Sequence, residues 1–331
     1  MRRGDGGQAM IGALVLVLMA TALVWLGLGV GSIGWQSPWQ AWSDDGLRQI
    51  VWEIRAPRTV GALLVGALLG LGGAVAQGLF RNPLAEPYLL GSASGACLGL
   101  VLMLTMGASW VNASTWLARL GLTGAAFVGA VAGVSLTLML SRGATQTMRL
   151  LLGGVVVGVV LGAVTELVLL WSAEAWRTMR AFMLGNTSML GWPACGLMGL
   201  MLAVTWPVGM LLSRVLDALS LGEDTARTLG IPLGTARGVL VAVLALSTAA
   251  AVAQAGLVAF VGLVAPHLAR PWAGARHASM LWASSLLGGV LLLASDVLAR
   301  SLIAPQELPV GVLTAVMGGV YLLVLLHRRA V

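Results

Sequence analysis

The sequence has 331 residues, of which 59% are hydrophobic and 9% are charged, and its mean hydropathy is +0.95. A water-soluble fold of this length does not need so much apolar surface, so the composition predicts an all-α, polytopic protein embedded in the lipid bilayer. All 19 basic residues are arginine, which excludes a P-loop lysine, a Schiff-base lysine and a lysine general base. The arginines lie between apolar segments, so the net charge of +7 indicates membrane topology and no nucleic-acid partner.

The first apolar segment covers residues 10–34 and follows an arginine pair, Arg2 and Arg3. The segment is longer than the core of an ordinary signal peptide, and no small-x-small cleavage site precedes Trp35. We therefore expect a membrane-spanning helix that the protein retains.

A second crossing is delimited by arginines. The sequence R-A-P-R at 55–58 is followed by 22 residues without a charge, from Thr59 to Phe80. About 20 residues at ~1.5 Å each match the ~30 Å apolar core of a bilayer. The polar segment R-N-P-L-A-E-P at 81–87 then predicts a hinge.

Two later segments carry glycine at four-residue spacing. Small residues at this spacing share one helical face and let helix backbones approach closely in lipid. These glycines are Gly91, Gly95 and Gly99 in the first segment and Gly154, Gly158 and Gly162 in the second.

Thr165 and Glu166 follow the second set of glycines. A carboxylate at membrane depth costs about 2.5–3.5 kcal/mol on the insertion scale, so Glu166 is expected to face a cavity or a partner. A hydrogen bond to a neighbouring helix and a contact with a transported substrate both remain open.

Apolar stretches of spanning length recur along the whole chain. The stretch 238–268 would make about 45 Å of helix, too long for one perpendicular crossing. Arginine pairs near both termini place both ends in the cytoplasm, which requires an even number of crossings. Dividing the long stretch near 256–259 gives ten predicted spans: 10–34, 60–80, 88–110, 116–140, 150–171, 189–212, 238–256, 259–272, 279–299 and 308–326.

The ten-span topology agrees with the distribution of two residue types. It places 12 of the 19 arginines at the cytoplasmic end, and nine of the 13 tryptophans flank the outer loops as an interfacial belt. The sequence Ala-Val-Ala-Gln occurs at 74–77 and at 251–254, in spans of opposite direction. This pattern predicts an inverted repeat of the kind that many transporters contain.

One sizeable cytoplasmic insert, residues 213–236, lies between the sixth and seventh spans. Ser220 and Glu223 have the spacing of a capping box, and Gly230 followed by Pro232 can end a helix. We predict a short helix outside the membrane, with Leu221, Thr225 or Ala226, and Leu229 on one face. The insert is either a surface helix that links two spans or a docking helix for a cytoplasmic partner.

The remaining polar residues favour structural roles. His267 and His277 lie at the cytoplasmic end of the eighth span, where helix-end histidines are favoured over haem ligands. Asp296 lies one turn before Arg300, which favours a local ion pair over a proton relay. Cys97 and Cys195 lie in apolar segments and are expected to be buried thiols, so we predict no metal site.

Four motifs together resemble one family. They are R-A-P-R with Q-G-L-F-R-N-P-L-A-E-P and L-G-S-A-S-G-A at 55–96, L-G-E-D-T-A-R-T-L-G at 221–230, F-V-G-L-V-A-P-H-L-A-R at 260–270 and E-L-P-V-G-V-L-T-A at 307–315. The resemblance is to the FecCD-like membrane permeases of type II ATP-binding-cassette importers for iron–siderophores, haem and vitamin B12. It implies a single permease domain of ten helices in the bacterial inner membrane. It also implies a homodimer with a central pathway, a periplasmic binding protein, and separate ATPase subunits that hold the ATP and Mg²⁺, with no cofactor bound by this subunit.

The resemblance also implies roles for individual residues. Arg55, Arg58 and Arg300 match arginines that dock the binding protein. The residues that match the ATPase-coupling helix are Ser220, Leu221, Gly222, Glu223, Asp224, Ala226, Arg227, Leu229 and Gly230. The residues on helices that match the pathway wall are Gly91, Gly95, Gly154, Gly158, Gly162, Thr165 and Glu166. The residues at the position of the cytoplasmic gate are Ser141, Arg142, Gly143 and Thr145.

Two other classes of membrane protein are alternatives to an importer permease. An ion-coupled secondary transporter should contain several buried carboxylates or histidines, and the sequence offers Glu166 and Asp296. A membrane haem protein needs facing histidine pairs within helices, which three histidines do not supply. The importer permease is therefore the favoured hypothesis. No motif shows whether its substrate is a siderophore, haem or cobalamin.

Overall fold

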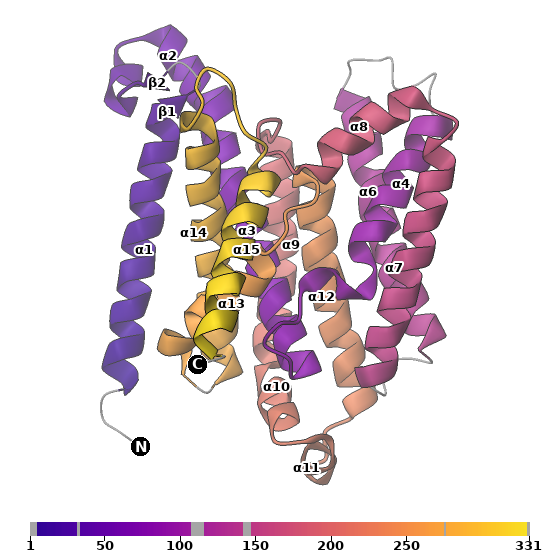
Figure 1. Ribbon diagram of the computed structural model, residues 1–331. Helices are drawn as coiled ribbons and strands as arrows, with labels where there is room; N and C mark the ends of the chain where they lie inside the picture. The colour runs from indigo at the N-terminus through magenta and orange to yellow at the C-terminus, as the bar shows by residue number, and fades with distance from the viewer. Residues whose placement is uncertain (1–4, 32–33, 107–115, 142–146, 275, 330–331) are drawn as a thin grey trace.

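The computed structural model describes residues 5–31, 34–106, 116–141, 147–274 and 276–329 as a bundle of long helices (Figure 1). A small hairpin of β1 (Val30–Gly31) and β2 (Gly34–Trp35) lies at one end of the bundle. The long helices are α1 (Asp5–Gly29), α3 (Ala56–Phe80), α4 (Ser92–Met106), α6 (Trp116–Leu140), α7 (Thr147–Leu169), α9 (Trp192–Leu211), α12 (Leu233–Ala255), α13 (Val261–Ala273), α14 (His277–Ser301) and α15 (Val310–Arg329). The shorter elements are η1 (Pro38–Trp42), α2 (Asp45–Ile50), η2 (Val51–Arg55), η3 (Pro87–Leu90), α8 (Ala173–Met183), α10 (Ser213–Ser220) and α11 (Glu223–Thr228).

Each of the ten predicted spans overlaps one of the long helices. Seven helical segments in the described part of the chain are long and apolar enough to cross a membrane: α1, the continuous run α2–η2–α3, α6, α7, α9, α12 and α14. Helix α4 and the apolar part of α15, Val310–Leu325, are shorter. With 13 residues, α13 extends only about 20 Å, which is less than the apolar thickness of a bilayer. The protein is therefore a multi-pass membrane protein, and the count of ten crossings stays a prediction.

The first helix differs from its predicted range of 10–34. It covers Asp5–Gly29 and stops where β1 begins, because the backbone turns back through Gly34, which has a φ of +107°, and pairs Val30 with Trp35. The long stretch 238–268 is broken between Ala255 and Val261, in the region where we placed the division.

Helix α3 is the centre of the packing. It contacts α9, α12, α13 and α14, and most of its residues are buried. A Cβ atom built on Gly66, Gly70 or Gly73 would lie under 3.0 Å from backbone atoms of α14 or α13. Backbone-to-backbone approach of this kind is how small residues pack helices in lipid, where the hydrophobic effect does not drive helix association.

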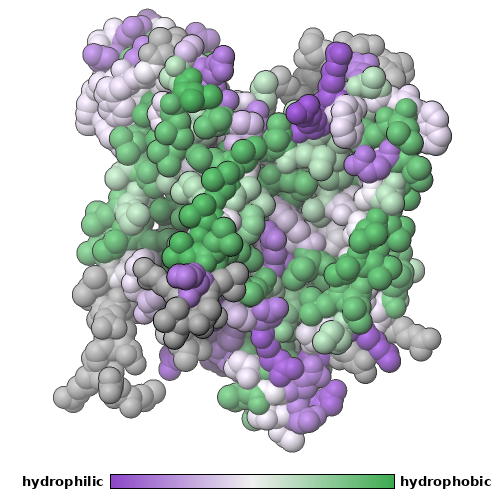
Figure 2. Space-filling view, in the orientation of Figure 1, coloured by the Kyte–Doolittle hydropathy of each residue, from purple (hydrophilic) through white to green (hydrophobic). Residues whose placement is uncertain are grey.

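The bundle has two polar ends and an apolar middle. Figure 2 shows apolar side chains over the middle of the molecule and polar side chains gathered at its two ends. The start of α1, the end of α15, α10 and α11 lie at one end, whereas β1, β2, α2 and α8 lie at the other (Figure 1). Helices α3 and α12, which carry the two Ala-Val-Ala-Gln sequences, pack against each other in opposite directions. An inverted repeat stays a prediction.

Candidate functional site

The insert 213–236 forms two short helices, α10 and α11, separated by a turn at Gly222 with a φ of +117°. The Ser220 hydroxyl donates to the Asp217 carbonyl oxygen at 2.6 Å, so Ser220 ends α10 and does not cap α11. The Glu223 carboxylate accepts instead from Arg237 at 2.6 Å. The predicted capping box is therefore wrong, because both of its side chains have other partners.

The end of α11 forms at the predicted glycine. Gly230 has a φ of +76°, and the Ile231 N–H donates to the Ala226 carbonyl oxygen across the turn. Leu221 and Leu229 are 70% and 64% exposed, whereas Ala226 is fully buried against the bundle. Of the two alternatives that the prediction left open, Ala226 faces the bundle, whereas Thr225 is exposed together with the two leucines. Leu221 precedes α11 and Leu229 follows it, and we call these two residues the outward leucines of α11.

Glu223 lies at the start of α11, and its side chain turns back toward the bundle. Its Oε1 atom is 2.6 Å from Arg237 of α12 and 3.9 Å from Arg81, which caps the end of α3. Thr147, the first residue of α7, donates to Oε1 at 3.4 Å. Burial alone would raise the pKa of Glu223, but the hydrogen bond and charge of Arg237, with the charge of Arg81, outweigh it and lower this pKa below its usual range.

A buried charge network occupies the opposite end of the bundle. Asp296 is fully buried, and its Oδ1 atom accepts from Arg58 Nε at 3.0 Å and from the Thr187 hydroxyl at 2.6 Å. Its Oδ2 atom accepts from Arg300 at 2.5 Å, which confirms the predicted local pair. Arg58 also donates to both carboxylate oxygens of Glu307, at 3.0 and 2.8 Å.

The three arginines matched to docking positions are not exposed in this structure. Arg55, Arg58 and Arg300 are 7%, 7% and 2% exposed. Arg55 donates to the carbonyl oxygens of Leu28 and Gly29 and to the Gln36 side chain, so it holds η2 against the end of α1 and the hairpin. Internal carboxylates and carbonyl oxygens therefore bind all three guanidinium groups. Docking of a binding protein by these three residues stays a prediction.

A second polar connection joins the hinge at 81–87 to the break between α12 and α13. Glu86 accepts from the backbone N–H of Phe260 at 3.2 Å, and the Tyr88 hydroxyl donates to the Val258 carbonyl oxygen at 3.0 Å. Phe260 has a φ of +67° at the start of α13, where an acidic side chain can stabilise the free N–H groups of the helix end. Sequence reasoning missed this connection, although a carboxylate between Pro83 and Pro87, in the hinge between two apolar spans, was a usable signal.

The glycines of the predicted pathway helices have different surroundings. A Cβ atom on Gly95 or Gly154 would meet a backbone carbonyl oxygen of a neighbouring segment at under 3.0 Å. Gly91 precedes α4, and its carbonyl oxygen accepts the Gly95 N–H. A Cβ atom on Gly158 would make only an ordinary van der Waals contact, and one on Gly162 would have open space around it.

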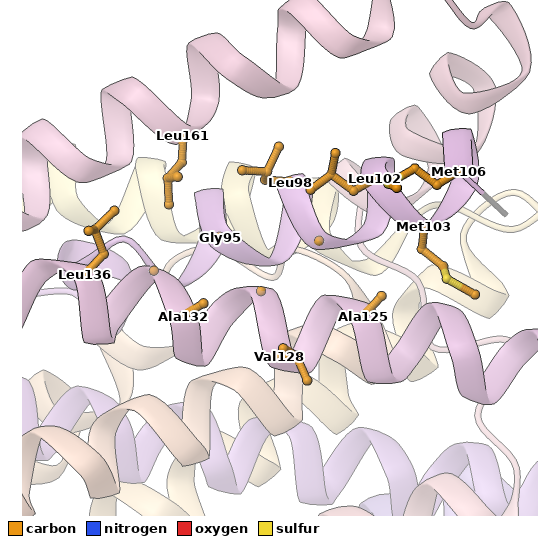
Figure 3. Close-up of a pocket in the computed structure, with 13 residues that line it drawn as sticks. Gly95, Leu98, Leu102, Met103, Met106, Ala125, Val128, Ala132, Leu136 and Leu161 are labelled. Atoms are coloured by element: carbon orange, nitrogen blue, oxygen red, sulfur yellow. The ribbon is translucent and has the colours of Figure 1, made fainter.

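An apolar groove of about 450 Å³ lies between α4 and α6 (Figure 3). Leu98 and Leu102 of α4 and Val128 of α6 are among its lining residues, with Leu161 of α7 at one side. Further along α7, the Thr165 hydroxyl donates to the Leu161 carbonyl oxygen at 2.8 Å, whereas Glu166 lies on the exposed face of the helix.

Ser141, His267 and His277 are further predicted residues that the structure describes. The Ser141 hydroxyl donates to the Arg149 carbonyl oxygen at 3.1 Å, whereas Arg142, Gly143 and Thr145 lie outside the described residues. His277 Nδ1 is 2.7 Å from Asp217, as expected for a helix-end histidine. The ring of His267 packs edge-on against Tyr321, with a centroid separation of 5.8 Å. No group of three or more metal-ligating side chains occurs in the part of the chain that the structure describes.

Comparison with known proteins gives concordant matches over nearly the full length. The model of the FecCD transport family matches residues 14–328. The chain is 36% identical over 328 residues to the hemin transport system permease protein HmuU of Yersinia pestis, with 97% of this chain and 96% of that protein covered. It is 38% identical over 321 residues to the vitamin B12 import system permease protein BtuC of Pectobacterium atrosepticum, with 96% and 93% covered.

Solved structures agree with these matches. A metal-chelate type ABC transporter in an inward-facing conformation has a TM-score of 0.85 and 28% sequence identity, with 95% of this chain and 98% of that chain covered. PsaBC from Streptococcus pneumoniae has a TM-score of 0.60 at 16% identity, with 83% and 92% covered, and shows the same fold.

Proposed function

Because the chain belongs to the FecCD transport family, we propose that it is the membrane-spanning permease subunit of an ATP-driven importer for a bulky metal chelate in the bacterial inner membrane. It is a transport subunit, and ATP is hydrolysed by separate subunits. The observation that carries this conclusion is the family match over residues 14–328, which includes all of the long helices except the start of α1 and the end of α15.

The assembly that we propose contains two copies of this chain, two ATPase subunits and a periplasmic binding protein. Helix α7 supports the pairing of two copies, because it is the least buried of the seven candidate spans in the described residues. Val155, Val159 and Leu167 are each more than half exposed on it. We infer that the outward face of α7 meets the second copy and that the pathway runs between the two.

The orientation that we propose places both termini in the cytoplasm. The start of α1 and the end of α15 lie at the same end of the bundle as α10 and α11, and arginine pairs adjoin both chain ends. The outward leucines of α11 then face the ATPase. The hairpin end faces the periplasm and the binding protein.

Changing both outward leucines of α11 to aspartate (Leu221→Asp with Leu229→Asp) should weaken binding of the ATPase subunit about tenfold or more, because two exposed apolar anchors would become charged. Leu302→Asp is the matched control, since Leu302 is 56% exposed and lies at the C-terminal end of α14, away from α11. Titration of the purified ATPase onto the reconstituted permease measures the effect. Equal affinity of the ATPase for both variants would contradict the assignment of α11 as the coupling helix.

The substrate class rests on two relatives of different specificity. The permeases named for hemin and for vitamin B12 match this chain at 36% and 38% identity, which supports a bulky metal chelate and favours neither compound. The direct test is uptake by liposomes that contain the permease, its ATPase and its binding protein. We expect ATP-dependent uptake of one compound among haem, cobalamin and a ferric siderophore.

Two controls make the uptake experiment decisive. Liposomes without the ATPase, and complete liposomes without ATP, should take up none of the three compounds. Uptake that needs neither would overturn the importer and favour an ion-coupled transporter, with Glu166 as the first candidate for the ion site.

A further inference from the structure

The covalent connections of α11 to the rest of the chain both pass through glycine in a left-handed or extended positive-φ conformation. Gly222 has a φ of +117° before the helix, and Gly230 has a φ of +76° after it. Glycine adopts such conformations with little steric restriction, so these two positions can bend when force is applied to α11. Because both glycines can bend, displacement of α11 is not passed to α12 through the backbone alone.

Glu223 supplies a second, non-covalent connection. Its carboxylate lies 2.6 Å from Arg237 of α12 and 3.9 Å from Arg81 at the end of α3, and it accepts from Thr147 of α7 at 3.4 Å. It also lies 3.9 Å from Arg227 within α11. A single side chain of α11 therefore contacts the cytoplasmic ends of three long helices.

The pair with Arg237 is the strongest of these contacts. The Arg237 side chain is only 3% exposed and that of Glu223 is 25% exposed, so water screens this pair less than the exposed pairs of α11. By comparison, the side chains in the Arg227–Asp224 pair are 61% and 97% exposed. Removal of the Glu223 carboxylate would leave the buried charge of Arg237 without this partner, whereas loss of an exposed pair changes little.

We propose that Glu223 is the positioning residue through which displacement of α11 is passed to α3, α7 and α12. The proposal rests on the function proposed above, in which an ATPase moves α11 as a rigid body. The outward leucines bind the ATPase, and the inward carboxylate makes the ends of the three membrane helices follow. Binding of the ATPase therefore does not require the Glu223 carboxylate, whereas transmission of the movement requires it.

The test uses the complete transporter, with its ATPase and binding protein, in liposomes. In Glu223→Gln, which keeps the size of the side chain and removes its charge, we expect ATPase binding and ATP hydrolysis within twofold of the wild type. We expect the number of substrate molecules taken up per ATP to fall about tenfold, a typical size for a lost coupling between two sites. Glu174→Gln, an exposed carboxylate on α8 at the other end of the bundle, should leave this ratio unchanged.

A charge-swapped variant, Glu223→Arg with Arg237→Glu, should recover part of the lost uptake per ATP. An unchanged ratio in Glu223→Gln would overturn the proposal. A loss of uptake that accompanies a loss of ATPase binding or of folded protein would also overturn it, because Glu223 would then serve docking or stability. Absence of ATP-dependent uptake by the wild type would instead contradict the proposed function itself, so the two failures are distinguishable.

Discussion

Replacing Asp296 by asparagine should lower the free energy of unfolding by about 3–5 kcal/mol, the usual cost of removing one partner from a buried ion pair. Asp296 is fully buried, and its two oxygens accept from Arg58, Arg300 and Thr187. Without the charge of Asp296, Arg58 and Arg300, which are 7% and 2% exposed, would lose a shared buried carboxylate. Arg58 would keep its bond to Glu307, whereas Arg300 would keep neutral backbone carbonyl oxygens as acceptors. Thermal unfolding in detergent measures the change.

The control for this prediction is Asp45→Asn. Asp45 is paired with Arg48, but the two side chains are 89% and 64% exposed, so the free energy of unfolding should change by about 0–1 kcal/mol. A second variant tests whether charge is the cause. Asp296→Asn combined with Arg300→Met removes one charge of each sign and should be less destabilised than Asp296→Asn alone. Equal unfolding temperatures for Asp296→Asn and Asp45→Asn would contradict the prediction.

The network around Asp296 shows what residue order alone cannot supply. The Asp296–Arg300 pair was predictable, because residues four apart on a helix are neighbours. The bond from Arg58 to Glu307 joins residues 249 positions apart, and nothing in either segment specifies the other. Length and hydropathy fix how deep an arginine lies in the bilayer, but they do not fix which neighbouring helix it faces. Sequence reasoning therefore placed these arginines at the ends of their helices but did not predict the internal partners of Arg58.

The insert shows a second limit. Ser220 and Glu223 satisfy the capping-box spacing, but the same serine can end a preceding helix by donating to a carbonyl three residues earlier. The outcome depends on α10, whose Leu216 and Leu219 are buried in the core and extend the helix to Ser220. The capping-box spacing alone cannot predict which hydrogen bond Ser220 makes, because the burial of α10 determines where that helix ends. Gly230 was predictable because the positive φ at that position favours glycine, whatever its surroundings.

Helix α7 shows a third limit. Glu166 was expected to face a cavity or a partner, and within one copy of the chain it is exposed. The expected energetic cost of a carboxylate in lipid still holds, so the position of Glu166 supports a water-filled or protein surface beside α7. The sequence indicates that such a surface is needed, and we expect the proposed assembly of two copies to provide it.

Substituting alanine for Gly73 should prevent stable folding of the bundle, with a loss of more than about 3 kcal/mol, at or beyond the upper end of ordinary overpacking. The added methyl group would lie under 3.0 Å from the carbonyl oxygen, carbonyl carbon and Cα of Gly262. All three are backbone atoms, so no side-chain rotation relieves the overlap and α13 must move away from α3. That movement would strain the bond from Gln77 Nε2 to the Leu263 carbonyl oxygen, which is now 3.1 Å long.

The neighbouring residue provides a matched comparison for Gly73→Ala. A methyl group on Gly72 would meet first the Thr248 Cγ2 atom, at 3.3 Å, and a side-chain methyl can shift by a few tenths of an ångström. Gly72→Ala should therefore change the free energy of unfolding by no more than about 1 kcal/mol, since alanine also favours the helix by about that amount. The two variants have the same composition and lie in the same turn, so a large difference in unfolding temperature must come from the approach of α13. Equal tolerance of both would mean that α3 and α13 are farther apart than the structure places them, and the bond between Gln77 and Leu263 could not then form.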